Sequence, residues 1–79
     1  MKAKVYVSYK EGVLDPQGQA VKKAISSLGY KGIEEVRQGR YFEIRLKEMP
    51  SAEADQLIKE IGEKILANPI IEKFEYRLE

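Results

Sequence analysis

The segment Gly12-Val13-Leu14-Asp15-Pro16-Gln17-Gly18 marks the point where an alternating apolar stretch gives way to a helix. The Asp15 carboxylate can accept hydrogen bonds from the free N–H groups of a first helical turn, and Pro16 has no N–H to lose. A helix is therefore predicted to start at Pro16. Gly18 is unusual there, because glycine inside a helix costs about 1 kcal/mol relative to alanine.

Two explanations fit Gly18. The helix start could pack closely against the chain's own sheet, or a partner or an anion could dock against the bare backbone at the positive end of the helix dipole. The local pattern on its own favours close packing, because nothing in the segment itself points to a ligand.

The segments on either side of this stretch have clear periodicities. Residues Lys2–Tyr9 alternate between apolar and polar, which predicts a half-buried strand. From Pro16 to Leu28 apolar residues recur at helical spacing, and Gly29 is a typical helix end. The residues predicted to be buried on this helix are Ala20, Val21, Ala24, Ile25 and Leu28.

The middle of the chain predicts two strands joined by a tight turn. Ile33–Arg37 is expected to form one strand, Gln38-Gly39 the turn, and Arg40–Lys47 the next strand. The alternation in the later strand is the clearest in the chain. It places three residues inward, namely Phe42, Ile44 and Leu46.

The last third predicts a helix followed by a strand. The helix begins near Ser51, carries an apolar stripe and stops before Pro69, and Ile70–Leu78 forms the final strand. The order βαββαβ predicts an α+β two-layer sandwich, with a four-stranded, mostly antiparallel sheet and both helices on one face. The other face is expected to be bare and to suit a protein partner. Residues expected on it include Lys4, Tyr6, Glu43 and Arg45.

Composition narrows the function. The 79 residues, 43% of them apolar, predict one domain spanning 1–79. The sequence has no cysteine and no histidine, so thiolate metal sites and histidine-based catalysis are excluded. With 14 basic and 13 acidic residues, the balance argues against a nucleic-acid partner. No apolar run suits a membrane and the first residues do not resemble a signal peptide, so a cytoplasmic location is expected.

The segment Arg37-Gln38-Gly39-Arg40 brings two guanidinium groups together beside the expected turn. Paired guanidinium groups can bind a phosphate or a carboxylate through several N–H donors. A solvated hairpin tip explains the same residues, and their spacing favours that explanation. No serine or carboxylate has a neighbouring base partner, so no catalytic residue is predicted.

Four segments in order resemble one family: PurS, the small subunit of phosphoribosylformylglycinamidine synthase. They are Gly12–Gly18, Leu28–Tyr30, Val36–Tyr41 and Leu66–Glu72. Arg40 stands where the family usually has lysine, which keeps the charge but changes its geometry.

The resemblance implies a non-catalytic subunit of de novo purine biosynthesis. It implies a homodimer or higher homo-oligomer that bridges a glutaminase subunit and an ATP-dependent synthetase subunit, so that ammonia passes between them. Mg-ATP is then used by the complex, and no cofactor or metal is bound by this chain alone.

With the resemblance added, contact with a partner becomes the favoured explanation for Gly18. Asp15, Pro16, Gln17 and Gly18 are expected to form one partner-facing surface, and Arg37, Gly39 and Arg40 a second. Asn68, Pro69 and Glu72 are expected to fix the last strand. A bulky residue at Gly18 is expected to weaken assembly while leaving the isolated fold intact.

Two other classes share the predicted architecture. An RNA-binding module of the RRM type has the same element order, but the strand from Arg40 carries Glu43 and lacks the glycine and aromatic pattern of such modules. A small-molecule regulatory domain also has this architecture, although nothing in the sequence identifies a ligand for it.

Overall fold

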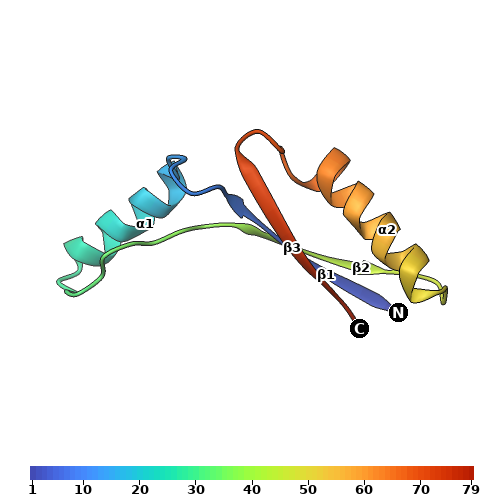
Figure 1. Ribbon diagram of the computed structural model, residues 1–79. Helices are drawn as coiled ribbons and strands as arrows, with labels where there is room; N and C mark the ends of the chain where they lie inside the picture. The colour runs from blue at the N-terminus through green and yellow to red at the C-terminus, as the bar shows by residue number, and fades with distance from the viewer.

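The computed structural model describes all residues from Met1 to Glu79 (Figure 1). Its elements are β1 (Lys2–Tyr9), α1 (Pro16–Ser27), β2 (Arg40–Arg45), α2 (Ser51–Ile61), the π-helical turn η1 (Gly62–Leu66) and β3 (Glu72–Leu78). The start of β1, the start of α1 at Pro16 and the start of α2 at Ser51 agree with the sequence-based predictions. No helix has the length and apolar character needed to cross a bilayer.

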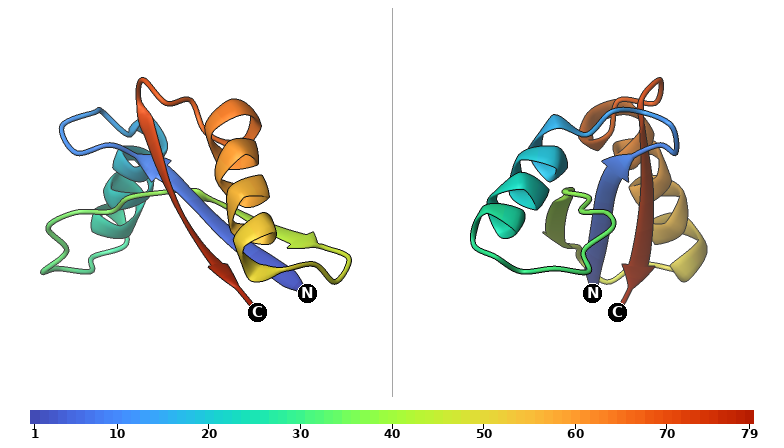
Figure 2. Two further views of the ribbon diagram at one scale, coloured as in Figure 1. Left: turned by 45° about the vertical axis from the view of Figure 1, so that its right-hand side comes forward. Right: turned by 90° about the vertical axis from the view of Figure 1, so that its left-hand side faces the viewer.

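The three strands form one antiparallel sheet in the order β2-β1-β3. Val5 at its centre lies opposite Phe42 on one side and Tyr76 on the other. Because side chains alternate between the faces of a strand, these three residues share one face. That face is covered by α2 and the turn η1 that follows it (Figure 2).

The core lies between this face and α2. Val5 and Ile58 are fully buried within it. Its buried apolar residues are Ala3, Val5, Val7, Ile58 and Ala67, and the half-buried residues packed around them are Phe42, Ile44, Leu46, Ile61, Leu66, Phe74, Tyr76 and Leu78. The predicted inward alternation of the strand that begins at Arg40 is therefore confirmed.

The turn η1 ends the second helix with a wider winding than an α-helix. The Ala67 N–H donates to the Gly62 carbonyl oxygen at 3.0 Å, a bond that spans five residues. Gly62 is buried against the aromatic ring of Phe74, and a Cβ placed there would lie 2.5 Å from a ring carbon. Position 62 therefore has no room for a side chain, and glycine is the residue that fits.

The prediction of four strands is wrong, because Ile33–Arg37 is not a strand. Its backbone lies beside the start of α1 instead of beside another strand. There the Lys22 ammonium donates to the Glu34 carbonyl oxygen, and the Val36 carbonyl oxygen lies against Gly18. The predicted turn at Gln38-Gly39 is also absent, because the chain runs through these residues directly into β2.

The prediction that both helices cover the sheet is also wrong. Helix α1 and the segments beside it, residues 10–39, extend away from the sheet as an arm (Figures 1 and 2). The remaining residues, 1–9 and 40–79, form the body. The Cα radius of gyration is 16.0 Å, whereas a compact chain of this length has about 12 Å. The molecule measures 50 × 24 × 15 Å.

The apolar stripe of α1 consequently has no cover within the chain. Val21 is 40% exposed and Leu28 77% exposed, although both were predicted to be buried. Of the five residues of the stripe, Ile25 alone is half-buried. Beyond the helix, Leu14, Tyr30 and Ile33 add further exposed apolar area to the arm.

The sheet face opposite α2 is bare, as predicted. Tyr6 and Tyr41 lie next to each other on it, with ring centroids 5.0 Å apart. Charged residues surround this pair, and one ion pair between neighbouring strands joins Lys2 to Glu43 at 2.8 Å.

Candidate functional site at the root of the arm

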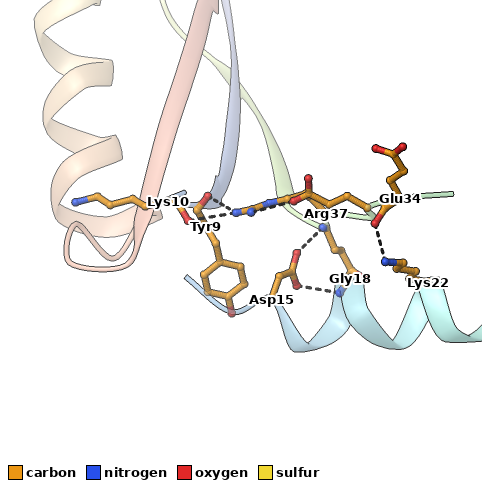
Figure 3. Close-up of polar contacts among 9 residues, drawn as sticks. Tyr9, Lys10, Asp15, Gly18, Lys22, Glu34 and Arg37 are labelled. Carbon is orange, nitrogen blue, oxygen red and sulfur yellow. Dashed lines mark hydrogen bonds and ion pairs between the residues drawn. The ribbon is translucent and has the colours of Figure 1, made fainter. Parts of the chain in front are cut away.

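Asp15 lies where the arm leaves the body, and both oxygens of its carboxylate are engaged (Figure 3). Oδ1 accepts the Gly18 N–H at 2.9 Å, which caps α1, and Oδ2 accepts the Gln38 N–H at 2.7 Å. The side chain is buried, at 6% exposure. The Gln38 and Gly18 N–H groups lower the pKa of the Asp15 carboxyl, because they favour its charged form. Asp15 thus joins the start of α1 to the segment that leads into β2.

Arg37 ties the same segment to the end of β1. One of its nitrogens donates to the Tyr9 carbonyl oxygen at 2.8 Å and to the Lys10 carbonyl oxygen at 3.3 Å (Figure 3). Its other terminal nitrogen reaches Glu35 at 3.3 Å. The guanidinium group is therefore used within the chain, and it bridges the two connections between arm and body.

Two glycines allow the backbones to approach closely at this root. A Cβ on Gly18 would collide with the Val36 carbonyl oxygen, and a Cβ on Gly39 would collide with the Val7 carbonyl oxygen. Gly18 is thus explained by close packing within the chain, although against the segment before β2 and not against the sheet. A bulky residue at Gly18 would disturb the arm itself, which differs from the expectation that the isolated fold would tolerate it.

A second polar cluster holds the start of β3. The Glu72 carboxylate accepts the Asn68 N–H at 2.7 Å and pairs with the Arg40 guanidinium at 2.8 Å. The Asn68 N–H, with Arg40 as a further contributor, lowers the pKa of the Glu72 carboxyl. Arg40 also donates to the Leu66 carbonyl oxygen at 3.0 Å, so it connects β2 to the end of η1.

The ten residues singled out from the sequence lie at the start of α1, in the segment leading into β2, and before and at the start of β3, and hydrogen bonds link these three places. Asp15 and Gln17 meet the segment before β2, since Gln17 accepts the Gln38 side-chain N–H at 2.9 Å. Arg40 then links that segment to Glu72. Pro16 and Pro69 are exposed, and the Pro69 carbonyl oxygen accepts the Lys10 ammonium at 2.6 Å. Contact of these ten residues with a partner stays a prediction.

Sequence reasoning missed Gln38, which contributes its backbone N–H to Asp15. No residue type signals such a contact, because any residue except proline has an N–H. Gly62 was also missed, although a glycine inside an otherwise strong helical pattern is a usable signal of close packing. The arrangement contains carboxylates, guanidinium groups and backbone amides that satisfy one another, so it is suited to fixing geometry.

Comparison with known proteins gives a consistent result. Residues 2–79 match the family model of PurS, phosphoribosylformylglycinamidine (FGAM) synthase. The chain is 49% identical over 78 residues to the PurS subunit of this synthase from Bacillus subtilis, which covers 99% of this chain and 92% of that protein. It is 43% identical over 74 residues to the PurS subunit from Archaeoglobus fulgidus, which covers 94% of this chain and 92% of that protein.

Solved structures agree with this. The B. subtilis PurS structure superposes with a TM-score of 0.88 at 49% identity, covering 99% of this chain and 96% of that one. The Methanocaldococcus jannaschii PurS structure, one of the subunits of formylglycinamide ribonucleotide amidotransferase in the purine biosynthetic pathway, gives 0.87 at 32% identity, with coverage of 99% and 94%. A chain of the Thermotoga maritima PurLQS structure shares the fold, with a TM-score of 0.86 at 24% identity over 96% and 93% of the two chains. The RNA-binding alternative finds no support here.

Proposed function

Because the chain belongs to the PurS family and is a non-catalytic subunit of phosphoribosylformylglycinamidine synthase in purine biosynthesis, we propose that it bridges the catalytic subunits of that enzyme. The observation that carries this proposal is the uncovered apolar stripe of α1. An amphipathic helix whose apolar side is left in solvent by its own chain marks a surface for contact with another protein.

A second copy of the chain is the first partner that we propose. The body covers one sheet face with a single helix and leaves the other face bare, while the arm exposes Val21 and Leu28. A homodimer in which these surfaces are covered would also reinforce a chain with a small core. The exposed Tyr6–Tyr41 pair supports the same proposal, because aromatic residues are enriched at interfaces.

The other proposed partners are a glutaminase subunit and an ATP-dependent synthetase subunit. Glutamine hydrolysis would release ammonia in the first, and the second would use Mg-ATP to activate formylglycinamide ribonucleotide. The paired polar groups at the root of the arm fit a structural role, so the catalytic groups and the cofactor are assigned to the partners. The elongated shape, 50 Å in its longest dimension, lets one chain contact two neighbours. We place the complex in the cytoplasm.

A reconstitution with two nitrogen sources tests this proposal. The glutaminase and synthetase subunits are assayed for amidine formation with and without this chain, first with glutamine and then with ammonium chloride. A bridging subunit is required only where ammonia must travel between subunits, so its omission is expected to abolish the glutamine-driven reaction and spare the ammonium-driven one. Equal loss of both reactions, or loss of neither, would contradict the proposal.

A further inference from the structure

The arm and the body meet at the root described above and at Lys10, whose N–H and ammonium donate to the Ile71 and Pro69 carbonyl oxygens. The chain passes between them twice, at residues 9–10 and at residues 39–40, and α1 packs against no strand to any large extent. The buried residues of the arm are Asp15 and Gly18, neither of which has an apolar side chain. Hydrophobic packing within the chain therefore does not set the direction of the arm.

Polar contacts hold the chain together at the root instead. Asp15 holds the start of α1 to residue 38, and Arg37 holds the segment before β2 to the end of β1. Gly18 and Gly39 let the backbones come into contact at the same place. We call these four residues, Asp15, Gly18, Arg37 and Gly39, the root clamp.

Both functional groups of the clamp are directed into the chain. The two carboxylate oxygens of Asp15 accept backbone N–H groups, and one nitrogen of Arg37 spans two carbonyl oxygens. A helix cap needs one oxygen only, so the second oxygen of Asp15 serves the connection to Gln38. A carboxylate used in this way acts on the position of α1 and not on an external ligand.

We propose that the root clamp fixes the angle between arm and body and so presents the apolar stripe of α1 in one orientation. Asp15 and Arg37 are then positioning residues for assembly, not partner contacts. The consequence for assembly rests on the proposed bridging function, whereas the control of the angle does not.

The absence of cysteine allows a direct test of the angle. Spin labels are attached to Lys31→Cys in the arm and Lys47→Cys in the body, both exposed positions. The labelled chain is diluted with an excess of unlabelled chain, and the intramolecular distance is measured by double electron–electron resonance. A narrow distribution is expected for the parent chain.

Asp15→Asn is the decisive variant. Its oxygen can still cap Gly18, but its NH₂ group faces the Gln38 N–H, so a donor meets a donor. The distance distribution is expected to broaden while α1 stays helical by circular dichroism. Lys22→Met is the control, because it removes one hydrogen bond inside the arm, to Glu34, and leaves the root intact. A distribution in Asp15→Asn as narrow as that of the parent chain, at the same distance, would overturn the clamp.

Arg37→Lys and Asp15→Ser keep the test decisive if Asp15→Asn loses the helix. Lysine has a single ammonium in place of the planar guanidinium, and serine caps a helix with one oxygen. Both are expected to broaden the distribution, and unchanged distributions would overturn the proposal equally.

The effect of the clamp on assembly is measured in a separate binding experiment. Binding of Asp15→Asn to the glutaminase and synthetase subunits is expected to weaken by about fivefold or more, because a buried N–H loses its acceptor whenever the arm is held in place. Unchanged binding with a broadened distance distribution would overturn this consequence. If the parent chain itself binds neither subunit, the bridging function fails while the distance measurement still decides the clamp.

Discussion

The body and the arm are stabilised by different interactions, although they are similar in helix content and charge. The body buries Ala3, Val5 and Ile58 completely between one helix and one sheet face. The arm fully buries only a carboxylate and a glycine, and leaves most of its apolar residues in solvent. A region folded by hydrophobic burial uses its apolar surface internally, whereas a region held by backbone hydrogen bonds keeps that surface for a partner.

The largest effect on folding is expected from Ile58→Ala in the body. Removing a fully buried isoleucine leaves a cavity and should lower the free energy of unfolding by about 2–5 kcal/mol, measured by urea denaturation. Ile65→Ala is the matched control, because Ile65 is 75% exposed in the adjoining turn and should change stability by only about 0.5 kcal/mol. Equal effects of the two substitutions would show that the core is not centred on Ile58.

Gly62→Ala is expected to have the next largest effect. The new methyl group would press on the Phe74 ring and should cost about 1–3 kcal/mol. A smaller residue at position 74 relieves the clash, so the cost of Gly62→Ala should fall in a Phe74→Leu background. A double-mutant cycle measures this coupling, and strictly additive effects would contradict the contact.

A charged residue in the apolar stripe of α1 is expected to weaken assembly without unfolding the helix. Val21→Lys should leave α1 helical by circular dichroism, because lysine is at least as good a helix former as valine. It should weaken self-association by about tenfold or more in sedimentation velocity, because a charge would enter the proposed interface. Ser26→Lys on the polar side of α1 adds the same charge and should leave self-association unchanged. Equal behaviour of both variants would place the interface elsewhere.

Acid pH is expected to act weakly on both regions, at separate carboxylates. The folded-state pKa values of Asp15 and Glu72 lie below their ordinary values, so each carboxylate stabilises the fold at neutral pH. That contribution is lost as the pH falls through the depressed folded-state pKa, below about pH 4. Arg37 and Arg40 are the charged groups beside Asp15 and Glu72, respectively, and they stay protonated throughout.

NMR titration of the two carboxyl carbons distinguishes the regions. Asp15→Asn should remove the acid-induced change from amide shifts of the arm, and Glu72→Gln from those at the start of β3. An ordinary pKa for either carboxyl in the folded chain would contradict the hydrogen bonding described for that residue.

Much of the body was predictable because its patterns are local. The alternation of apolar and polar residues around Phe42 and Ile44 indicates which face of the strand points inward, and Pro16 indicates the start of α1. The strand predicted at Ile33–Arg37 failed because the neighbouring partner is the start of α1, a contact between residues far apart in sequence. The apolar stripe of α1 was identified correctly, but an amphipathic pattern does not show whether the surface that covers the stripe belongs to the same chain or to a partner.

The site was predictable in part for a similar reason. Asp15 was expected to cap α1, and it does. Its second bond goes to a backbone N–H located 23 residues away, which no side-chain pattern reveals. The pairing of Arg40 with Glu72 likewise depends on the antiparallel arrangement of β2 and β3 about β1.

The wide winding of η1 accommodates one residue more than an α-helical turn would hold. Deleting a single residue between Glu63 and Leu66 would let the helix continue as a regular α-helix to its end. The residues after the deletion would then keep nearly their present phase around the helix axis, because the wide turn had absorbed the residue removed. In a regular α-helix the same deletion would rotate them by about 100° and take Ala67 out of the core. The wide turn therefore lets the chain carry a surplus residue without moving the position at which it turns back into β3.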